Sequence, residues 1–290
     1  MRPEPGLRPD LLGLLCCPIT HAPLRMDNGE LVSLSSAPRR YAVHAGIPIF
    51  VHPSDQNDTR SASSIALAFR ERSAGYFRSN YQAGGNLGRI ARLSIAIDLL
   101  ETFARTGMRT LDVGAGPAVL AEAAEHLALD YIALDLSLEN LLEGRRRAGS
   151  DAAIVGDVTA LPIRAGSFDI VVALGCLEYV EDLDRAAIEI SRVMKPGGRL
   201  VASFANARSP GRQWQENVRN PLWRMRERLA GRGATLYRRY LSDEAAVREV
   251  FGQHRLAVDR VEYIGSPSER NRTRRPETRA SEFLIVAVRR

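Results

Sequence analysis

A glycine pair follows an acidic residue at the end of an apolar run, in the segment Leu111-Asp112-Val113-Gly114-Ala115-Gly116. Glycines where a strand turns into a helix let the backbone approach a ligand closely, and the free N–H groups of the first helical turn bind a polar or anionic group. Asp135 ends the next apolar run, 19 residues after Gly116. A carboxylate at that point can accept two hydrogen bonds from a ribose diol. The spacing therefore predicts a binding site for a nucleoside.

Two features of the same turn favour a nucleoside over a dinucleotide. A nicotinamide-binding turn needs a third glycine at position 119, for close packing of the helix on the strand, and this chain has Val119. Pro117 suits the first turn of a helix, but it lacks the N–H that a pyrophosphate would use. A nucleoside without phosphates fits this pattern better.

A candidate contact for the base of that nucleoside follows a later β-rich run, in Gly156-Asp157-Val158. The Asp157 carboxylate can accept a hydrogen bond from an adenine amine, and the Val158 N–H can donate to a ring nitrogen. Open parallel sheets bind ligands at the carboxyl ends of their strands. We therefore expect these residues to meet Gly114 and Asp135 at one edge of a sheet.

The elements that must position these residues alternate between β-rich and helical runs from Arg109 onward, which is typical of a parallel sheet covered by helices. The expected strands are Arg109–Val113, Tyr131–Leu134, Ala152–Val155, Phe168–Leu174, Arg199–Phe204, Leu256–Tyr263 and Phe283–Val288. The expected helices are Ala118–Leu127, Leu138–Arg147, Leu183–Met194 and Ser242–Phe251, with Asp182 and Ser242 as N-caps of the last two. The predicted fold class is α/β: a doubly wound, Rossmann-like sheet of seven strands, five joined by crossovers and then a C-terminal pair.

The chain divides into three zones by composition. Residues 1–53 are turn-rich with short strands, and we expect a small ribbon-like β domain there. Residues 54–107 combine a polar linker with an N-terminal helical cap, and residues 108–290 form the α/β domain. Within that domain, residues 207–240 are expected to form a lid insert, and residues 265–281 a mobile loop that is long for a structureless connection.

Further segments occur in the same order along the chain. They are Ala133-Leu134-Asp135-Leu136-Ser137, Leu161-Pro162, Ser167-Phe168-Asp169, Leu177-Glu178-Tyr179-Val180-Glu181-Asp182 and Val193-Met194-Lys195-Pro196-Gly197-Gly198. Together with the glycine turn and Gly156-Asp157-Val158, they resemble class I S-adenosylmethionine-dependent methyltransferases, in the subgroup of ubiquinone, menaquinone and other small-molecule methyltransferases. The resemblance runs in order over about residues 109–206 and more loosely to residue 290.

The resemblance implies S-adenosyl-L-methionine as the cofactor and a set of residues that contact it. Gly114 and Gly116 would face its amino-acid end, Asp135 its ribose, Asp157 with Val158 its adenine, and Leu174 its sulfonium. It also implies Asp112 and Leu136 as cofactor contacts.

Two positions depart from the family pattern. Pro117 and Ala118 stand where the family usually has Thr or Ser followed by another Gly. Glu178-Tyr179 stands where the family often has Glu-His after the fourth strand. Transfer to oxygen or nitrogen needs a base near the carboxyl end of that strand, so Glu178 and Tyr179 are the candidate catalytic residues.

The N-terminal zone, over Leu11–Val51, resembles the zinc ribbon of tRNA-methyltransferase activator subunits. Such ribbons bind zinc through two Cys-x-x-Cys pairs. In this chain Thr20 replaces the second cysteine of the first pair, and the region 33–36 offers no thiol. We therefore assign no metal site. The alternative set of Cys17, His21, His44 and His52 has suitable ligand types without the usual spacing.

Composition limits the classes of protein. The chain has 290 residues, 45% of them hydrophobic and 26% charged, which is typical of globular proteins. No apolar run is long enough for a membrane span, and three cysteines, two of them adjacent, build no disulfide framework. We expect a soluble, cytoplasmic protein whose oligomeric state the sequence leaves open. The net charge of +6 allows a nucleic-acid partner, although arginine makes up all but one of the 40 basic residues, which indicates a coding bias.

Three functions are compatible with these observations. The leading hypothesis is an enzyme that methylates a small molecule, aromatic or lipid-like, in specialised metabolism or quinone-like chemistry. The alternatives are an RNA base methyltransferase and a cofactor-binding scaffold or non-methylating enzyme. We expect three segments to bound the acceptor: the helical entry with Tyr76, Phe77 and Tyr81, the loop 265–281, and the lid insert. In the insert, Leu222, Met225 and Leu229 share a helical face near Trp214 and Trp223.

Overall fold

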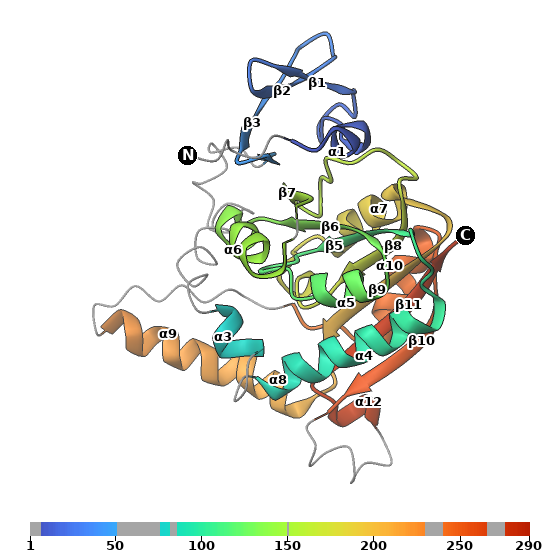
Figure 1. Ribbon diagram of the computed structural model, residues 1–290. Helices are drawn as coiled ribbons and strands as arrows, with labels where there is room; N and C mark the ends of the chain where they lie inside the picture. Colours follow the sequence, from blue (N-terminus) through green and yellow to red (C-terminus); the bar gives the residue numbers. More distant parts are fainter. Residues whose placement is uncertain (1–6, 51–75, 82–85, 150, 230–239, 266–275) are drawn as a thin grey trace.

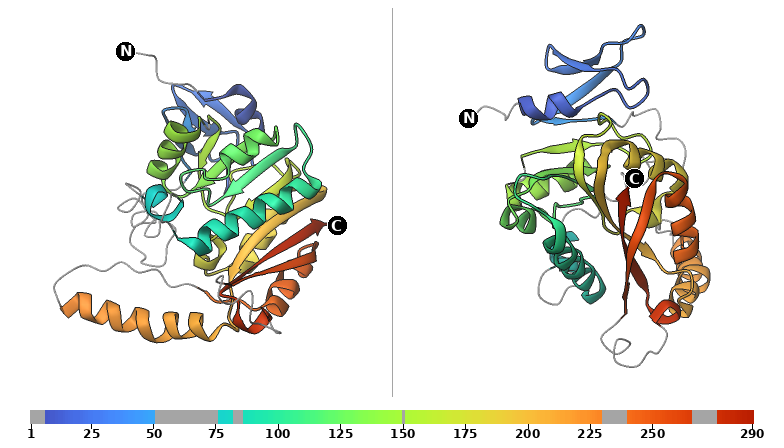
Figure 2. Two further views of the ribbon diagram at one scale, coloured as in Figure 1. Left: turned by 60° about the horizontal axis from the view of Figure 1, so that its bottom comes forward. Right: turned by 90° about the vertical axis from the view of Figure 1, so that its right-hand side faces the viewer.

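The computed structural model describes residues 7–50, 76–81, 86–149, 151–229, 240–265 and 276–290 (Figure 1). A small antiparallel sheet lies near the N-terminus, and a large sheet lies between helices (Figure 2). The small sheet contains, in spatial order, β1 (Leu24–Asp27), β2 (Glu30–Ser33), β3 (Arg40–His44) and β4 (Ile47–Pro48).

Seven strands form the large sheet, in the order β10-β11-β9-β8-β5-β6-β7. They are β5 (Arg109–Val113), β6 (Asp130–Asp135), β7 (Ala153–Val155), β8 (Phe168–Ala173), β9 (Met194–Ala205), β10 (Leu256–Ile264) and β11 (Glu282–Arg289). The five strands from β9 to β7 run parallel, and β11 runs antiparallel between β9 and β10. The predicted fold class is confirmed, including its C-terminal strand pair.

Helices connect these strands and cover both faces of the sheet. They are α1 (Pro9–Leu14), α3 (Tyr76–Tyr81), α4 (Leu87–Phe103), α5 (Ala121–His126), α6 (Leu138–Ala148), α7 (Leu183–Val193), α8 (Pro210–Trp214), α9 (Asn220–Leu229), α10 (Glu244–Gln253) and α12 (Pro276–Arg279). A 3₁₀ turn, Leu177–Tyr179, follows β8, and a π-helix, Gln215–Arg219, joins α8 to α9.

The central strands are apolar on both faces. On β8, Ile170 and Val172 pack in the hydrophobic cluster that contains α4, whereas Val171 and Ala173 pack in the cluster that contains α7 and α10. A sheet buried on both sides needs such continuous apolar strands. This packing fixes the positions of the strand ends, where the predicted ligand residues lie.

Of the two predicted N-cap residues, one caps its helix and the other does not. Asp182 caps α7 as predicted, because its carboxylate accepts from the Arg185 N–H at 2.9 Å. The prediction of Ser242 as the cap of α10 was wrong: Asp243 accepts from the Ala246 N–H at 2.8 Å. The Ser242 N–H donates to the Ala205 carbonyl at 2.9 Å, so that residue still belongs to extended backbone beside β9.

The start of α5 differs as well. The helix was expected from Ala118, but it begins at Ala121, because Ala118 has φ of +51°. A left-handed residue cannot continue a right-handed helix.

The N-terminal domain packs directly on the large sheet. Leu11 and Leu15 belong to the same hydrophobic cluster as Leu161 and Ile163, which lie just after β7. Backbone hydrogen bonds cross the boundary: the Cys16 N–H donates to the Pro162 carbonyl at 3.0 Å. The Phe50 N–H donates to the Val155 carbonyl at 2.9 Å, next to the predicted adenine-binding residues. The domain therefore covers the β7 edge and the loop after it.

This packing predicts how far a shortened side chain in the shared core lowers the free energy of unfolding. Leu15→Ala should lower the free energy of unfolding by roughly 2–5 kcal/mol, because Leu15 is fully buried between the two sheets. Leu34→Ala, at an exposed leucine of the same domain, should change it by less than about 0.5 kcal/mol. Urea unfolding of both variants measures the difference, and equal effects would contradict a shared core.

Cys17, the cysteine that matches the zinc-ribbon pattern, contacts a tyrosine. The Cys17 thiol lies 3.0 Å from the Tyr41 hydroxyl. Across the described ranges, no group of three or more His, Cys, Asp or Glu side chains is close enough to hold a metal ion. His52 lies outside those ranges.

The two segments expected to cover the site are partly described. In the insert, α8, the π-helix and α9 extend from the end of β9 as one helical arm (Figure 1), and Trp214, Leu222 and Met225 are exposed on it. The side chains of Trp223 and Leu229, and residues 230–239, lie outside the description. The loop expected at 265–281 contains the short helix α12, and its residues 266–275 also lie outside. None of the helices described here is both long enough and apolar enough to cross a bilayer.

Candidate active site

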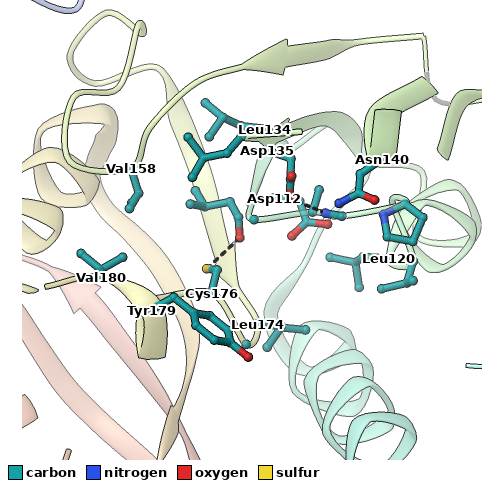
Figure 3. Close-up of a pocket in the computed structure, with 18 of the residues that line it drawn as sticks. Asp112, Leu120, Leu134, Asp135, Asn140, Val158, Leu174, Cys176, Tyr179 and Val180 are labelled. Carbon is teal, nitrogen blue, oxygen red and sulfur yellow. Dashed lines mark hydrogen bonds between the residues drawn. The ribbon is translucent and has the colours of Figure 1, made fainter. Parts of the chain in front are cut away.

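The turn after β5 lies against the loop that follows β8. Gly114 has φ of +67°, and a Cβ built on it would lie 2.9 Å from the Cys176 Sγ and closer still to its Cβ. The Cys176 thiol in turn donates to the Val113 carbonyl at 3.1 Å (Figure 3). Position 114 therefore requires glycine for both its conformation and its space. Gly116 has φ of +55° but faces open space.

Asp135, at the end of β6, joins this turn to the next helix. Its carboxylate accepts from the Gly116 N–H at 2.8 Å and from the Ser137 N–H at 2.9 Å. Burial raises the pKa of Asp135, while these two hydrogen bonds and one from Asn140 act in the opposite direction. A carboxylate has about four lone-pair directions, and three are used by these contacts, so Asp135 can hold the turn and still accept about one hydrogen bond from a ligand.

Asp112 is a second buried carboxylate in the same place. It is 4% exposed and accepts from the Tyr131 hydroxyl at 2.7 Å. Burial raises the pKa of Asp112 to about 7; the negative charge of Asp135 contributes in the same direction, and the Tyr131 hydrogen bond opposes both. Two such carboxylates make the site receptive to a cationic group.

The raised pKa of Asp112 predicts how stability depends on pH. The ordinary value is 3.8, so the folded chain binds this proton more tightly than the unfolded chain. The stability gained in this way is complete below about pH 4 and is lost as the pH rises through about 7. Asp112→Asn cannot ionise, so the variant should lose less stability between about pH 5 and about pH 8 than the wild type. Urea unfolding at both pH values tests this, and an equal loss in the two proteins would contradict it.

A cavity of about 300 Å³ opens at the carboxyl ends of β5, β6 and β8 (Figure 3). Its volume lies at the lower end of the range for small-molecule sites. Every residue predicted to contact the cofactor lines it: Asp112, Gly114, Gly116, Asp135, Leu136, Asp157, Val158 and Leu174. The sequence thus predicted which loops meet at the edge of the sheet.

The two candidate catalytic residues line different cavities. Tyr179 lines the first, where Figure 3 shows its ring beside Leu174. Glu178, its neighbour on the 3₁₀ turn, is buried and lines a second cavity of about 510 Å³. The turn therefore directs one side chain to each cavity.

Several lining residues were not predicted. Asn140 of α6 and Arg89 and Arg92 of α4 line the first cavity. Asn140 follows its N-cap Ser137 by three residues, and no local motif marks it as a ligand contact. Tyr81, expected at the helical entry, also lines the cavity, and its ring stacks on Phe77 at 6.1 Å between centroids.

An ion-pair network lies where the two cavities adjoin. Arg92 donates to Glu282 at 3.0 Å, and Arg212 donates to the other oxygen of the same carboxylate. Both arginines and Glu282 line the second cavity, and Arg92 also lines the first. A Cβ on Gly175 would lie 2.5 Å from the Arg92 guanidinium, so the loop after β8 fixes that side chain closely.

Comparison with known proteins shows what the central part of the chain is similar to. A family model described as a methyltransferase domain matches residues 111–202. That stretch runs from the glycine turn through β8 to the middle of β9 and contains all the predicted cofactor contacts. Residues 111–202 are thus similar to a methyltransferase domain, and they lie in an α/β sheet of seven strands.

Two curated relatives are each similar to about a third of the chain. The chain is 43% identical over 97 residues to a demethylmenaquinone methyltransferase of Renibacterium salmoninarum, covering 33% of this chain and 41% of that protein. It is 33% identical over 98 residues to a malonyl-[acyl-carrier protein] O-methyltransferase of Enterobacter lignolyticus, covering 34% of this chain and 39% of that protein. The chain thus spans about two fifths of the length of these relatives.

Solved structures share the fold at low sequence identity. The magnesium protoporphyrin IX methyltransferase of Synechocystis, with bound SAH, is 18% identical with a TM-score of 0.57, covering 79% of this chain and 99% of that chain. A complex of the Trm112 methyltransferase activator with a methyltransferase of Haloferax volcanii also matches. It is 19% identical with a TM-score of 0.55, covering 77% of this chain and 96% of that chain.

Proposed function

We propose that this chain is an S-adenosylmethionine-dependent methyltransferase that acts on a small-molecule acceptor. The observation that carries the proposal is the coincidence of the methyltransferase-domain match with a cavity lined by two glycines of positive φ and by the carboxylates of Asp112 and Asp135. The demethylmenaquinone and malonyl-carrier-protein methyltransferases among the relatives support small-molecule chemistry. In this proposal residues 108–290 form the catalytic domain, and residues 1–53 form an accessory ribbon-like domain.

The residues of the first cavity fit the cofactor. Asp135 would bind the ribose diol, while Asp157 and the Val158 N–H would bind adenine. Gly114 would expose its backbone to the cofactor, at a position where a Cβ would clash with Cys176. Gly116 and Asp112 would face the amino-acid end of the cofactor. Leu136 and Leu174 supply apolar contacts. When bound, S-adenosylmethionine supplies an electrophilic methyl group on a positively charged sulfur.

The chain's own residues must hold the acceptor in line and exclude water. Tyr81, Leu93, Leu174 and Tyr179 give the cavity an apolar and aromatic wall between α4 and the loop after β8. This wall suits an aromatic or lipid-like acceptor. Fixed positions of this kind contribute more to methyl transfer than any single reactive side chain.

Glu178 and Tyr179 receive different roles in this proposal. Glu178 is buried at the second cavity, which shares Arg92 with the first, and we propose that its carboxylate takes the proton of an acceptor oxygen or nitrogen. Tyr179 lies at the first cavity and positions the acceptor against the methyl donor.

Transfer of a labelled methyl group tests the function. The purified chain is incubated with methyl-labelled S-adenosylmethionine and either a small-molecule extract or total RNA. We expect label in the low-molecular-mass fraction with the wild type and its loss with Glu178→Gln at unchanged affinity for S-adenosylhomocysteine. Label in RNA alone, or in neither fraction, would contradict the proposal.

A further inference from the structure

The second cavity has a different chemistry from the first. It lies between the start of α4, the 3₁₀ turn after β8, the α8 and π-helix segment, and the start of β11. Among the residues that the structure describes, its lining contains no aliphatic or aromatic side chain: the charged members are Arg89, Arg92, Arg212, Arg219, Glu178 and Glu282, and the rest are serine, glycine, asparagine and glutamine. An apolar group would find no partner there.

Among the described lining residues of this cavity there are four arginines and two carboxylates. Glu282 is shared between Arg92 and Arg212, so one carboxylate faces two guanidinium groups. All three side chains are largely buried, with Arg92 at 5% and Arg212 at 12% side-chain exposure. Glu178 is buried at the same cavity, so the buried part of the lining holds as many carboxylates as arginines. An anion would therefore bind at the exposed part of the lining, where a guanidinium is not matched by a buried carboxylate.

Arg219 brings a further guanidinium to the rim of this cavity. It lies on the π-helix with Gln215, and both residues line the cavity. Single π-helical turns are rare and occur often at functional sites. Arg219 is exposed, and no carboxylate in the described part of the chain pairs with it. Its guanidinium can therefore donate two parallel hydrogen bonds to a carboxylate or phosphate.

The two cavities meet at α4, because Arg89 and Arg92 line both. An anionic group in the second cavity would thus hold the rest of the same molecule beside Tyr179 and Leu174.

We propose that the second cavity binds an anionic group of the acceptor, a carboxylate or a phosphate, and that Arg219 is a specificity-determining residue for it. This inference rests on the proposed function and adds the substrate class: an acceptor with an aromatic or apolar methyl-accepting part and a negatively charged end. The anion would bind the Arg219 guanidinium at the rim of the cavity.

Calorimetry with simple anions tests the inference on the full chain, both alone and saturated with S-adenosylhomocysteine. The probes are 3,4-dihydroxybenzoate, its neutral amide 3,4-dihydroxybenzamide, and inorganic phosphate. We expect an anion to bind at least about tenfold more tightly than the amide, because one charge-assisted hydrogen bond accounts for about that ratio. Preference for benzoate over phosphate identifies a carboxylate acceptor, and the reverse identifies a phosphate.

Arginine variants locate the binding. Arg219→Gln should weaken anion binding by about tenfold, Arg219→Lys should recover part of it, and Arg226→Gln, an exposed arginine further along the same helical arm, should leave it unchanged. Equal binding of benzoate and benzamide, no anion binding, or equal effects of the Arg219 and Arg226 variants would overturn the inference. Failure of the chain to bind S-adenosylhomocysteine would instead overturn the proposed function, because anion binding is measured separately.

Discussion

Replacing Asp135 with Ala should weaken binding of S-adenosylhomocysteine by at least about tenfold. The complex would lose one charged hydrogen bond from the ribose diol, worth roughly 1.5–3 kcal/mol. It also holds the Gly116 and Ser137 N–H groups, which the variant leaves without a partner. Calorimetric titration of the wild type and the variant measures the ratio of dissociation constants.

A matched control separates ligand binding from folding. Asp169 also accepts from a backbone N–H, that of Arg109 at 2.9 Å, and pairs with Lys195 at 2.8 Å, but near the amino ends of β5 and β8, away from the cavity. Asp169→Ala should therefore change the affinity by less than about twofold. If Asp135→Ala leaves the affinity unchanged, the cofactor site has been placed wrongly.

Gly114→Ala should lower the free energy of unfolding by roughly 2–5 kcal/mol and abolish cofactor binding. About 1–2 kcal/mol comes from forcing alanine into the left-handed region, since φ at this position is +67°. A further 1–3 kcal/mol or so comes from the clash with Cys176. Gly116→Ala, with φ of +55° and open space around it, should show only the conformational cost. Thermal and urea unfolding measure both variants.

A double variant identifies the clash itself. Cys176→Gly removes the side chain that a Cβ at position 114 would meet, so Gly114→Ala should cost less in that background than in the wild type. A double-mutant cycle expresses the difference as a coupling free energy. A coupling below about 0.5 kcal/mol would mean that the two loops do not approach as the structure has them.

The first cavity was predictable because its residues follow strand ends. The apolar runs fixed the strands to within a few residues, and the parallel topology then brings Gly114, Asp135 and Asp157 to one edge. Local conformation was harder to predict. Ala118 has a left-handed backbone conformation, and the Ser242 N–H donates to the carbonyl at the end of β9. Tertiary contacts therefore place both helix starts further along the chain than the residue types favour.

The second cavity was not predictable from local patterns. Arg92 and Glu282 are 190 residues apart in the chain, and neither belongs to a recognisable motif. Among 39 arginines, the sequence gives no sign of which side chains share one carboxylate. The N-terminal domain shows the same limit, because its short strands suggested a ribbon but not that Phe50 would pair with the β7 edge.

A crystal structure of the chain with S-adenosylhomocysteine tests the central claim most directly. We predict the adenosyl group between Asp135 and the Asp157-Val158 loop, with its sulfur towards Leu174 and open space beyond it leading to Arg92. Density for the ligand elsewhere on the molecule, or a first cavity filled by the chain itself, would contradict the claim.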